Sequence, residues 1–259
     1  MTRRFLLIAF AFVLTAATAR ADALDDIIKR GTLIVGVSLG TPPYGLTNAQ
    51  MEPDGYDVGL AKLISRELGV KVQIVDTVAS NRIPILTSGK ADIVISSFSI
   101  TAERAKVIAF TDCVFVDQQV AVAPEGVVLA SMDDMKGKRV GVTRASTNDI
   151  VMTRTAPSGA QIQRYDDDAS TSQAMLAGQV DAIVTSAALA AAIRDRNPAQ
   201  KLGIKFVVSQ APMAIGLRRG EPDLLHWLNT TIFMLWTNKE IQALQLKWMN
   251  TVNAELPRY

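Results

Sequence analysis

The sequence predicts an α/β protein with two lobes, in which mostly parallel sheets carry helices on both faces and a ligand cleft lies between the lobes. Strand-like and helix-like segments alternate along the chain, which is the order that builds a parallel sheet with crossover helices. The alternation breaks at Pro124-Glu125-Gly126 and then starts again, which indicates a second lobe. The chain crosses between the two series at short segments near 117–121 and 211–214, which predicts a hinge and a ligand outside the carboxyl ends of the strands.

The first series of strands and helices runs from residue 32 to residue 96. It opens with a β-rich segment, and an apolar stripe follows with the spacing of a helix that Asp57 can cap and Gly69 can end. An alternating segment, a short helix and a third apolar strand come next. The expected elements are a strand at 32–37, a helix at 58–68, a strand at 70–75, a helix at 81–86 and a strand at 93–96.

The second series begins at residue 120 and repeats the alternation, and two final helices complete the chain. The expected strands lie at 120–123, 138–142, 161–164, 180–184, 205–208 and 213–217. The expected helices lie at 131–136, 147–155, 170–177, 186–194, 222–236 and 239–249. We therefore expect lobe one to contain 22–118 together with 213–259, and lobe two to contain 119–212.

The first 21 residues have the pattern of a secretory signal peptide. Arg3 and Arg4 form a basic start, 5–14 is an unbroken apolar run, and Ala19-Arg20-Ala21 is a small-x-small cleavage site. The apolar run is too short to span a membrane. We expect cleavage after Ala21 and export to the periplasm; an uncleaved membrane anchor is the alternative. Since 27 basic residues stand against 25 acidic ones, loss of the signal arginines leaves a nearly neutral chain.

The composition excludes several classes of function. The sequence has no basic block and no interleaving of basic and aromatic residues, so nothing in it points to a nucleic-acid partner. Cys113 is the only cysteine and His226 the only histidine, so an intramolecular disulfide cannot form. A zinc site or a Ser–His or Cys–His catalytic centre also lacks its residues. We expect no cofactor and no metal, with Cys113 buried as an apolar residue; a reactive thiol is the alternative.

The most informative segment for function is 92–104, where an apolar strand runs into hydroxyl residues. A helix is expected to start near Thr101 and to carry Arg104 in its first turn. Backbone N–H groups at a helix start and the hydroxyls of Ser97 and Ser99 can donate to carboxylate oxygens. A guanidinium can hold both oxygens at once. The segment predicts capture of a small carboxylate; an ordinary strand–loop–helix connection with a solvated arginine is the alternative.

Several motifs follow one another at the spacing of one family. They are Gly55-Tyr56-Asp57-Val58-Gly59-Leu60-Ala61, the segment 83–92, Ser99–Arg104 with Phe110-Thr111-Asp112, and the closing Lys247-Trp248. Over its mature length the chain resembles the family 3 extracellular solute-binding proteins, the polar amino-acid receptors of ABC importers. The resemblance implies a type II periplasmic binding protein fold, a monomer without enzymatic activity, and an inner-membrane permease as partner.

The resemblance also implies which residues contact the ligand. Arg104 matches the arginine that pairs with the ligand α-carboxylate, with Ser97 and Ser99 beside it. Tyr44 follows Pro42-Pro43 and matches an aromatic residue that either packs on the ligand or forms the floor of lobe one. The other candidate contacts are Ser38 and Thr41 in lobe one, and Thr143, Ser146, Thr147 and Ser186 in lobe two.

Two departures from the family pattern concern the ligand's ammonium group. Ser38 stands where many relatives have an acid, and Ser186 stands where lobe two usually has an aspartate. A buried ammonium needs an anion or several acceptors. Either carbonyls, hydroxyls and water meet it, or the ligand lacks it; Ser186 could instead cap the next helix. Arg144 could add a second positive group that favours an acidic ligand, or could point to solvent.

The expected function is a receptor that closes on a carboxylate-bearing solute, a polar amino acid, and delivers it to a permease. One alternative is an exported lyase similar to cyclohexadienyl dehydratases, which needs a general acid in the cleft. Asp149 and Asp166-Asp167-Asp168 are the acids that could serve. A receptor for an organic acid without an α-amino group, and a sensor input domain, are further alternatives.

Overall fold

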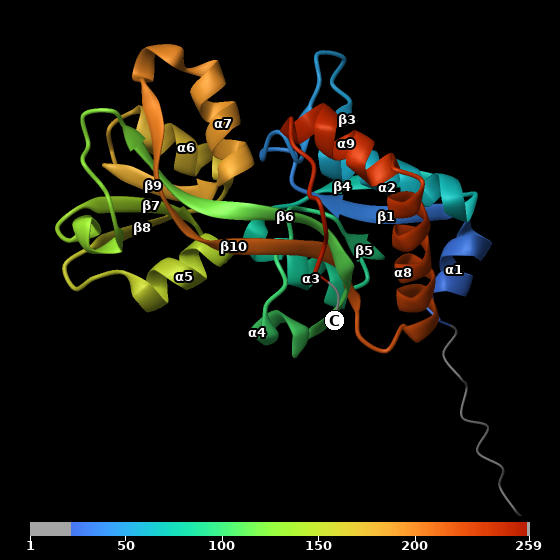
Figure 1. The fold of residues 1–259 in the computed structure, drawn as a ribbon. Helices are drawn as coiled ribbons and strands as arrows, with labels where there is room; N and C mark the ends of the chain where they lie inside the picture. The colour runs from blue at the N-terminus through green and yellow to red at the C-terminus, as the bar shows by residue number, and fades with distance from the viewer. Residues whose placement is uncertain (1–21, 258–259) are drawn as a thin grey trace, which may run out of the picture.

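The computed structural model of the chain describes residues 22–257, and the expected signal peptide at 1–21 lies outside the described residues. Two lobes lie side by side and are joined by two long strands that run through both, as Figure 1 shows. These strands are β6 (Ile108–Pro124) and β10 (Leu202–Arg218), each of 17 residues. They pair antiparallel along most of their length.

The two long strands correct the sequence prediction, which divided this region into short strands at 120–123, 205–208 and 213–217. Polar residues such as Gln118, Gln119 and Ser209 interrupt the apolar pattern in the middle of each strand. Pairing between the strands continues through this polar section, where Gln118 faces Gln210 and Gln119 faces Ser209. The lobes therefore share one eight-stranded sheet in the order β4-β1-β5-β10-β6-β9-β7-β8.

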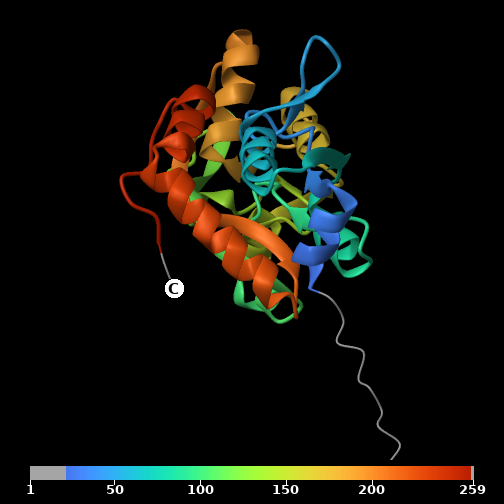
Figure 2. The ribbon, with the colours of Figure 1, turned by 90° about the vertical axis from the view of Figure 1, so that its right-hand side faces the viewer.

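Lobe one is built on three parallel strands with helices on both faces. Successive residues of a strand point to opposite faces, so Leu33 and Val35 join the core under α1, α2 and α8, while Ile34 packs on the opposite face beside α3. In Figure 2, α8 crosses the front of this lobe. The strands are β1 (Thr32–Val37), β4 (Lys71–Asp76) and β5 (Ile93–Val94), and the helices are α1 (Ala23–Arg30), α2 (Tyr56–Leu68), α3 (Arg82–Thr87), α4 (Ala102–Ala105), α8 (Pro222–Thr237) and α9 (Glu240–Met249). The hairpin β2 (Leu46–Thr47) and β3 (Pro53–Asp54) and the short η1 (Ala79–Asn81) complete the lobe.

Lobe two repeats the arrangement on a smaller scale. Val120 and Ile183 pack against α6 and α7 on one face, and Val140 and Val184 pack against α5 on the other. Two small cores therefore hold this lobe without a disulfide. Its strands are β7 (Arg139–Thr143), β8 (Gln161–Tyr165) and β9 (Ala182–Ser186), and its helices are η2 (Met132–Met135), α5 (Thr147–Thr155), α6 (Asp168–Leu176), α7 (Ala187–Arg196) and η3 (Pro198–Gln200).

Helix α2 differs from its prediction at its start. Gly55 occupies the N-cap position, with φ of 120°, and a Cβ there would lie 2.3 Å from the carbonyl oxygen of Tyr44, so only glycine fits. Asp57 is the second residue of the helix rather than its cap. Its carboxylate is 3% exposed and accepts the backbone N–H of Ser97 at 2.8 Å. The aspartate that looked like a local cap therefore joins α2 to the loop after β5.

The expected lobe boundaries, 118/119 and 212/213, fall inside β6 and β10. We retain 22–118 with 213–259 as lobe one, and 119–212 as lobe two, as a proposal.

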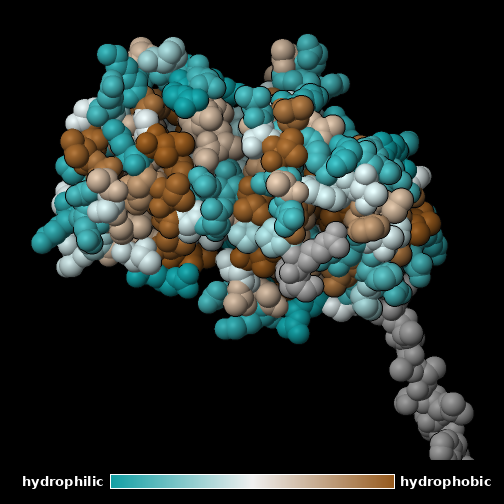
Figure 3. Space-filling model, in the orientation of Figure 1, coloured by the Kyte–Doolittle hydropathy of each residue, from teal (hydrophilic) through white to brown (hydrophobic). Residues whose placement is uncertain are grey.

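Cys113 is buried, as the sequence predicts, and its thiol donates to the carbonyl of Phe115. Figure 3 shows hydrophobic residues on this face in separate patches among hydrophilic ones. Between residues 22 and 257, no helix has the length and apolar character needed to cross a membrane.

Candidate functional site between the lobes

The carboxyl ends of β5, β7 and β9 face one another across the gap between the lobes, and a small cavity lies there. Its lining is mostly polar and comes from both lobes and from the middle of the two long strands. The lining residues are Thr41, Arg82, Ser97, Ser99, Gln119, Ser146, Thr147, Asn148, Asp168, Thr185, Ser186, Leu189, Ala211 and Met213. A larger hollow lies between α8 and the C-terminal segment and includes none of these residues.

Six of the predicted contact residues line this cavity: Thr41, Ser97, Ser99, Ser146, Thr147 and Ser186. Ser38 and Thr143 line a neighbouring hollow, which Thr41 and Asp168 also line. Arg104 and Tyr44 lie next to the cavity without forming its wall. The sequence reasoning missed Arg82, Gln119, Asn148 and Thr185, and it read Asp168 as a possible general acid.

The loop after β5 is held in place from behind. Ser97 has φ of 40°, a value that non-glycine residues rarely adopt, and its N–H is held by the carboxylate of Asp57. Ser99 bridges to Met213 on β10. Helix α4 then begins, and its N-cap Thr101 accepts the backbone N–H of Arg104 at 3.2 Å. These contacts place the hydroxyls of the loop and the arginine at the gap.

Arg104 is buried, with 6% exposure, so the alternative of a solvated arginine is wrong. Its Nη1 donates to the carbonyl of Ser99 at 2.6 Å and to the hydroxyl of Thr147 at 3.2 Å, and its Nη2 donates to the carbonyl of Ala145 at 3.0 Å. The guanidinium therefore joins lobe one to the start of α5 in lobe two. Burial, and to a smaller extent the charge of Arg82, lower the pKa of Arg104 to about 9, so it remains charged at neutral pH.

Arg82 is the first residue of α3 and is 4% exposed. Within residues 22–257 its side chain has no ion pair and no hydrogen bond, and its Nε is fully enclosed without a partner. Its guanidinium lies 5.4 Å from the ring centre of Phe98, and that of Arg104 lies 5.0 Å from the same centre. Burial lowers the pKa of Arg82, and the charges of Asp168 and Asp57 oppose this shift.

The signal that could have revealed Arg82 is its position in a buried short helix. Ile85 and Leu86 of α3 are core residues, and Arg82 lies one turn before them on the same side. An arginine at such a position has either a partner or a ligand. From the sequence, 81–86 was predicted only as a helix, and Arg82 was given no role.

Asp168 is the first residue of α6 and forms a second link between the lobes. Its Oδ2 accepts the hydroxyl of Thr41 from lobe one at 2.7 Å, and its Oδ1 accepts the hydroxyl of Thr143 at 2.5 Å. Thr143 is also hydrogen-bonded to Thr171. Both carboxylate oxygens are thus acceptors, and Asp168 lines the cavity at the same time.

Two further buried acids, Asp117 and Asp57, support the site from outside its lining. The hydroxyl of Tyr44 donates to Asp117 at 2.5 Å, and Asp117 also accepts the N–H of Ala188 at the start of α7. Burial raises the pKa of Asp117, and these hydrogen bonds oppose the rise. Tyr44 is 1% exposed. Of its two expected roles, the structure shows the role as a buried part of lobe one.

Burial likewise raises the pKa of Asp57 to about 7, against the opposing effects of Ser97 and Arg82.

Lobe two contributes helix starts to the cavity. Ser146 caps α5 by accepting the N–H of Asp149 at 3.1 Å, and Ser186 caps α7 by accepting the N–H of Leu189 at 3.1 Å. Ser186 therefore has the capping role that the sequence left open, and it also lines the cavity. Helix starts favour anions because their N–H groups and dipole point outward.

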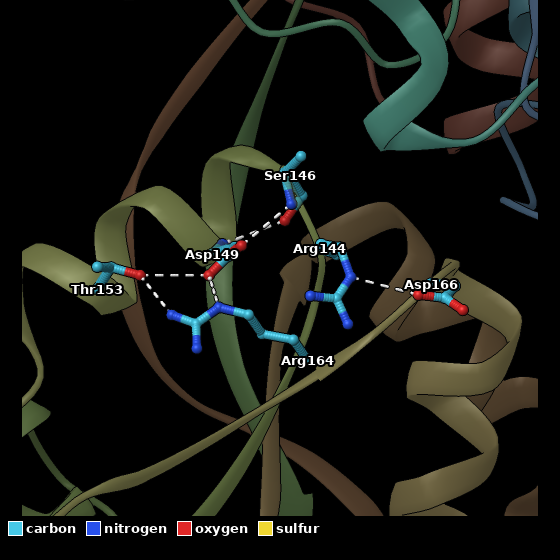
Figure 4. A network of polar contacts seen from close by, with 7 residues as sticks. Arg144, Ser146, Asp149, Thr153, Arg164 and Asp166 are labelled. Atoms are coloured by element: carbon cyan, nitrogen blue, oxygen red, sulfur yellow. Dashed lines mark hydrogen bonds and ion pairs between the residues drawn. The ribbon is translucent and has the colours of Figure 1, made fainter.

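The other charged residues that the sequence considered make contacts within lobe two, and Figure 4 shows those of Arg144, Asp149 and Asp166. Asp149 accepts from Arg164 at 2.7 Å and from the backbone of Ala145. Arg144 contacts Asp166 at 3.3 Å, and the two side chains are 52% and 86% exposed. Asp167 caps α6. None of these residues lines the cavity, so Arg144 is not the second positive group of this site.

The chain matches the family of bacterial extracellular solute-binding proteins, family 3, over residues 33–251, and it belongs to that family. It is 30% identical to the L-cystine-binding protein TcyJ of Escherichia coli K12 over 87% of this chain and 85% of that protein. The structure resembles the P235GK mutant of ArgBP from T. maritima, with a TM-score of 0.83 and 34% identity over 88% of this chain and all of that one. It also resembles the ancestral amino acid-binding protein AncCDT-1, a precursor of cyclohexadienyl dehydratase, with a TM-score of 0.81 and 30% identity over 88% and 99% of the two chains.

Proposed function

We propose that the protein is the periplasmic solute-binding receptor of an ABC importer, and that it captures a small carboxylate-bearing solute, a polar amino acid. The observation that carries this proposal is the position of Arg104. Its buried guanidinium reaches the loop after β5 in lobe one and the start of α5 in lobe two. A carboxylate placed between them can accept from the guanidinium and from the hydroxyl and N–H groups on both sides.

Binding in this proposal is coupled to a hinge motion of the lobes. The lobes are joined by β6 and β10, and the contacts from Arg104 to Thr147 and from Thr41 to Asp168 link their facing edges. A ligand that touches both edges binds the closed form more tightly than the open one, so it shifts the population toward closure. The closed receptor then docks on an inner-membrane permease, which receives the solute.

We also propose that the protein performs no chemistry on its ligand. Of the acids that a lyase could use, Asp149 is paired with Arg164, Asp166 is exposed and Asp167 caps a helix. Asp168 does line the cavity, but it accepts hydrogen bonds from two threonine hydroxyls. In this arrangement Asp168 is a hydrogen-bond acceptor, whereas a general acid has to donate.

The test combines calorimetry with solution scattering on the chain from residue 22. Titration with a panel of amino acids and organic acids identifies a ligand, and scattering is then recorded with and without it at saturation. We expect a saturable ligand with a carboxylate and a smaller radius of gyration in its presence. An unchanged radius with a calorimetrically proven ligand would contradict hinge closure, and release of a product from that ligand would contradict a pure receptor.

A further inference from the structure

We propose that the ligand is an acidic amino acid, with its α-carboxylate at Arg104, its second carboxylate at Arg82 and its ammonium group at Asp168. This inference deepens the proposed function and rests on it. It adds a second anion-binding group and an ammonium-binding group to the single carboxylate contact that defines the receptor.

The first step of the argument is the isolation of Arg82. Its side chain is almost completely removed from solvent, yet the described residues offer it no ion pair and no hydrogen bond. A guanidinium has five N–H donors and loses a large hydration free energy on burial. Arginine is seldom buried without a partner. Because Arg82 lines the cavity, a ligand in the cavity can supply that partner.

The second step concerns the neighbouring acids, which are already engaged elsewhere. Asp57 holds the N–H of Ser97 and does not line the cavity. Asp168 accepts from Thr41 and Thr143. Both carboxylates are close enough to influence the pKa of Arg82, but neither forms an ion pair with it. The N–H donors of Arg82 thus remain available for an anion that enters from the cavity.

The third step is the pairing of two guanidinium groups in one place. Arg82 and Arg104 lie over the same ring, Phe98, and the positive charge of Arg82 contributes to the lowered pKa of Arg104. Two buried like charges repel each other. One carboxylate balances one of them, whereas a ligand with two carboxylates balances both. A carboxylate contact at each arginine also fixes the distance between the two carboxylates.

The fourth step places the ammonium group. Ser186 carries no charge, and its hydroxyl caps α7. Asp168 is the acid of lobe two that lines the cavity. Its two oxygens each accept one hydroxyl, and each has a second lone pair for an ammonium N–H. Two guanidiniums and one carboxylate around the cavity match a ligand with two carboxylates and one ammonium.

The experiment compares matched ligands by isothermal titration calorimetry on wild type, Arg82→Met and the control Arg144→Met. The ligands are L-aspartate and L-glutamate, their amides L-asparagine and L-glutamine, and the diacids succinate and glutarate. We expect wild type to bind an acidic amino acid about 100-fold more tightly than its amide, because the amide leaves Arg82 without an anion. Arg82→Met should reduce that ratio to within about threefold, since both ligands then meet a neutral side chain. Arg144→Met removes an exposed charge and should leave the ratio unchanged.

Asp168→Asn supplies the second arm. Wild type should bind the amino acid more tightly than the diacid of the same length, and Asp168→Asn should reduce that difference about tenfold or more. Amides that bind wild type as tightly as acids would overturn the inference while leaving the proposed function standing, and this comparison needs no variant. A preference for acids that survives in folded Arg82→Met, or diacids that bind as well as amino acids, would also overturn it. Failure of every carboxylate in this panel to bind would overturn the inference, whereas failure of the wider panel of amino acids and organic acids would overturn the proposed function itself.

Discussion

Lobe one concentrates its charge near the cavity in two buried arginines, of which Arg82 lines the cavity and Arg104 lies next to it. The lobe-two side presents hydroxyls, helix starts and the single carboxylate of Asp168. The charges of lobe one are enclosed, and in the proposed function they bind the ligand. Most charges of lobe two, such as Arg144 with Asp166, form exposed pairs of the kind that contribute little to stability. Under the proposed function, this difference means that lobe one would fix where an anion binds and lobe two would complete the site on closure.

The strongest test of this comparison removes the guanidinium that reaches both lobes. Arg104→Met keeps an apolar side chain over Phe98 but removes all the N–H donors that this guanidinium offers to the ligand and to lobe two. We expect ligand binding to weaken by about 2–5 kcal/mol, as for one half of a buried charge pair, with circular dichroism unchanged. Calorimetry beside Arg144→Met measures the loss. Near-normal affinity in Arg104→Met would show that the carboxylate lies elsewhere and that the lobes share the binding more evenly.

The buried acid of lobe one should make stability depend on pH. Burial raises the pKa of Asp57 from 3.8 to about 7, so between these values the folded protein binds a proton that the unfolded chain does not. Protonation of Asp57 therefore favours the folded state at low pH, and this stabilisation is lost as pH rises through about 7. Between pH 5 and pH 8 the wild type should lose about 2–3 kcal/mol of unfolding free energy relative to Asp57→Asn.

Urea unfolding of both proteins at several pH values measures this difference. Asp57→Asn cannot ionise, so it serves as the reference whatever its absolute stability. A parallel pH dependence in the two proteins would mean that Asp57 keeps an ordinary pKa. Lobe one would then lack the buried charge cluster that distinguishes it from lobe two.

The hydrogen bond between Thr41 and Asp168 tests the link between the lobes alone. Thr41→Val keeps the shape of the side chain and removes a donor to a charged acceptor at 2.7 Å. We expect ligand affinity to fall by about 1–2 kcal/mol, because the closed form loses a contact that the open form does not make. Thr153→Val is the matched control, since that hydroxyl joins Asp149 and Arg164 within lobe two. Equal effects of the two variants on affinity would argue that the Thr41 contact does not favour closure.

The smallest effect is expected at Ser186, where lobe two has a neutral hydroxyl in place of an acid. Ser186→Asp preserves the N-cap, because aspartate is also a favoured cap. The added charge should attract ammonium groups and repel a second carboxylate. We expect affinity for neutral or basic L-amino acids to improve about tenfold relative to acidic or deaminated analogues. An unchanged ratio in paired titrations would remove position 186 from the ammonium site.

The predictability of the molecule differs between its local and its non-local features. The helix at 147–155 and the strand at 32–37 have the predicted bounds because cap, periodicity and propensity agree locally. The long strands β6 and β10 were predicted as fragments because their polar middle sections are recognisable as strand only through their pairing. Asp57 was predicted to cap α2, and it binds the loop after β5 instead, because Gly55 starts the helix two residues earlier.

The sequence by itself determined the α/β class, the family and the place of Arg104 one turn into a helix, because these depend on patterns that neighbouring residues share. The tertiary structure decided which charges face the cavity. Arg82 and Asp168 are 86 positions apart in the chain and look no different in sequence from Arg144 and Asp166. The rotation of α3 against the sheet buries Arg82, and the start of α6 brings Asp168 to Thr41 across the gap. Burial and partners depend on packing between distant elements, so the position of Arg82 at the cavity becomes visible only when the lobes are assembled.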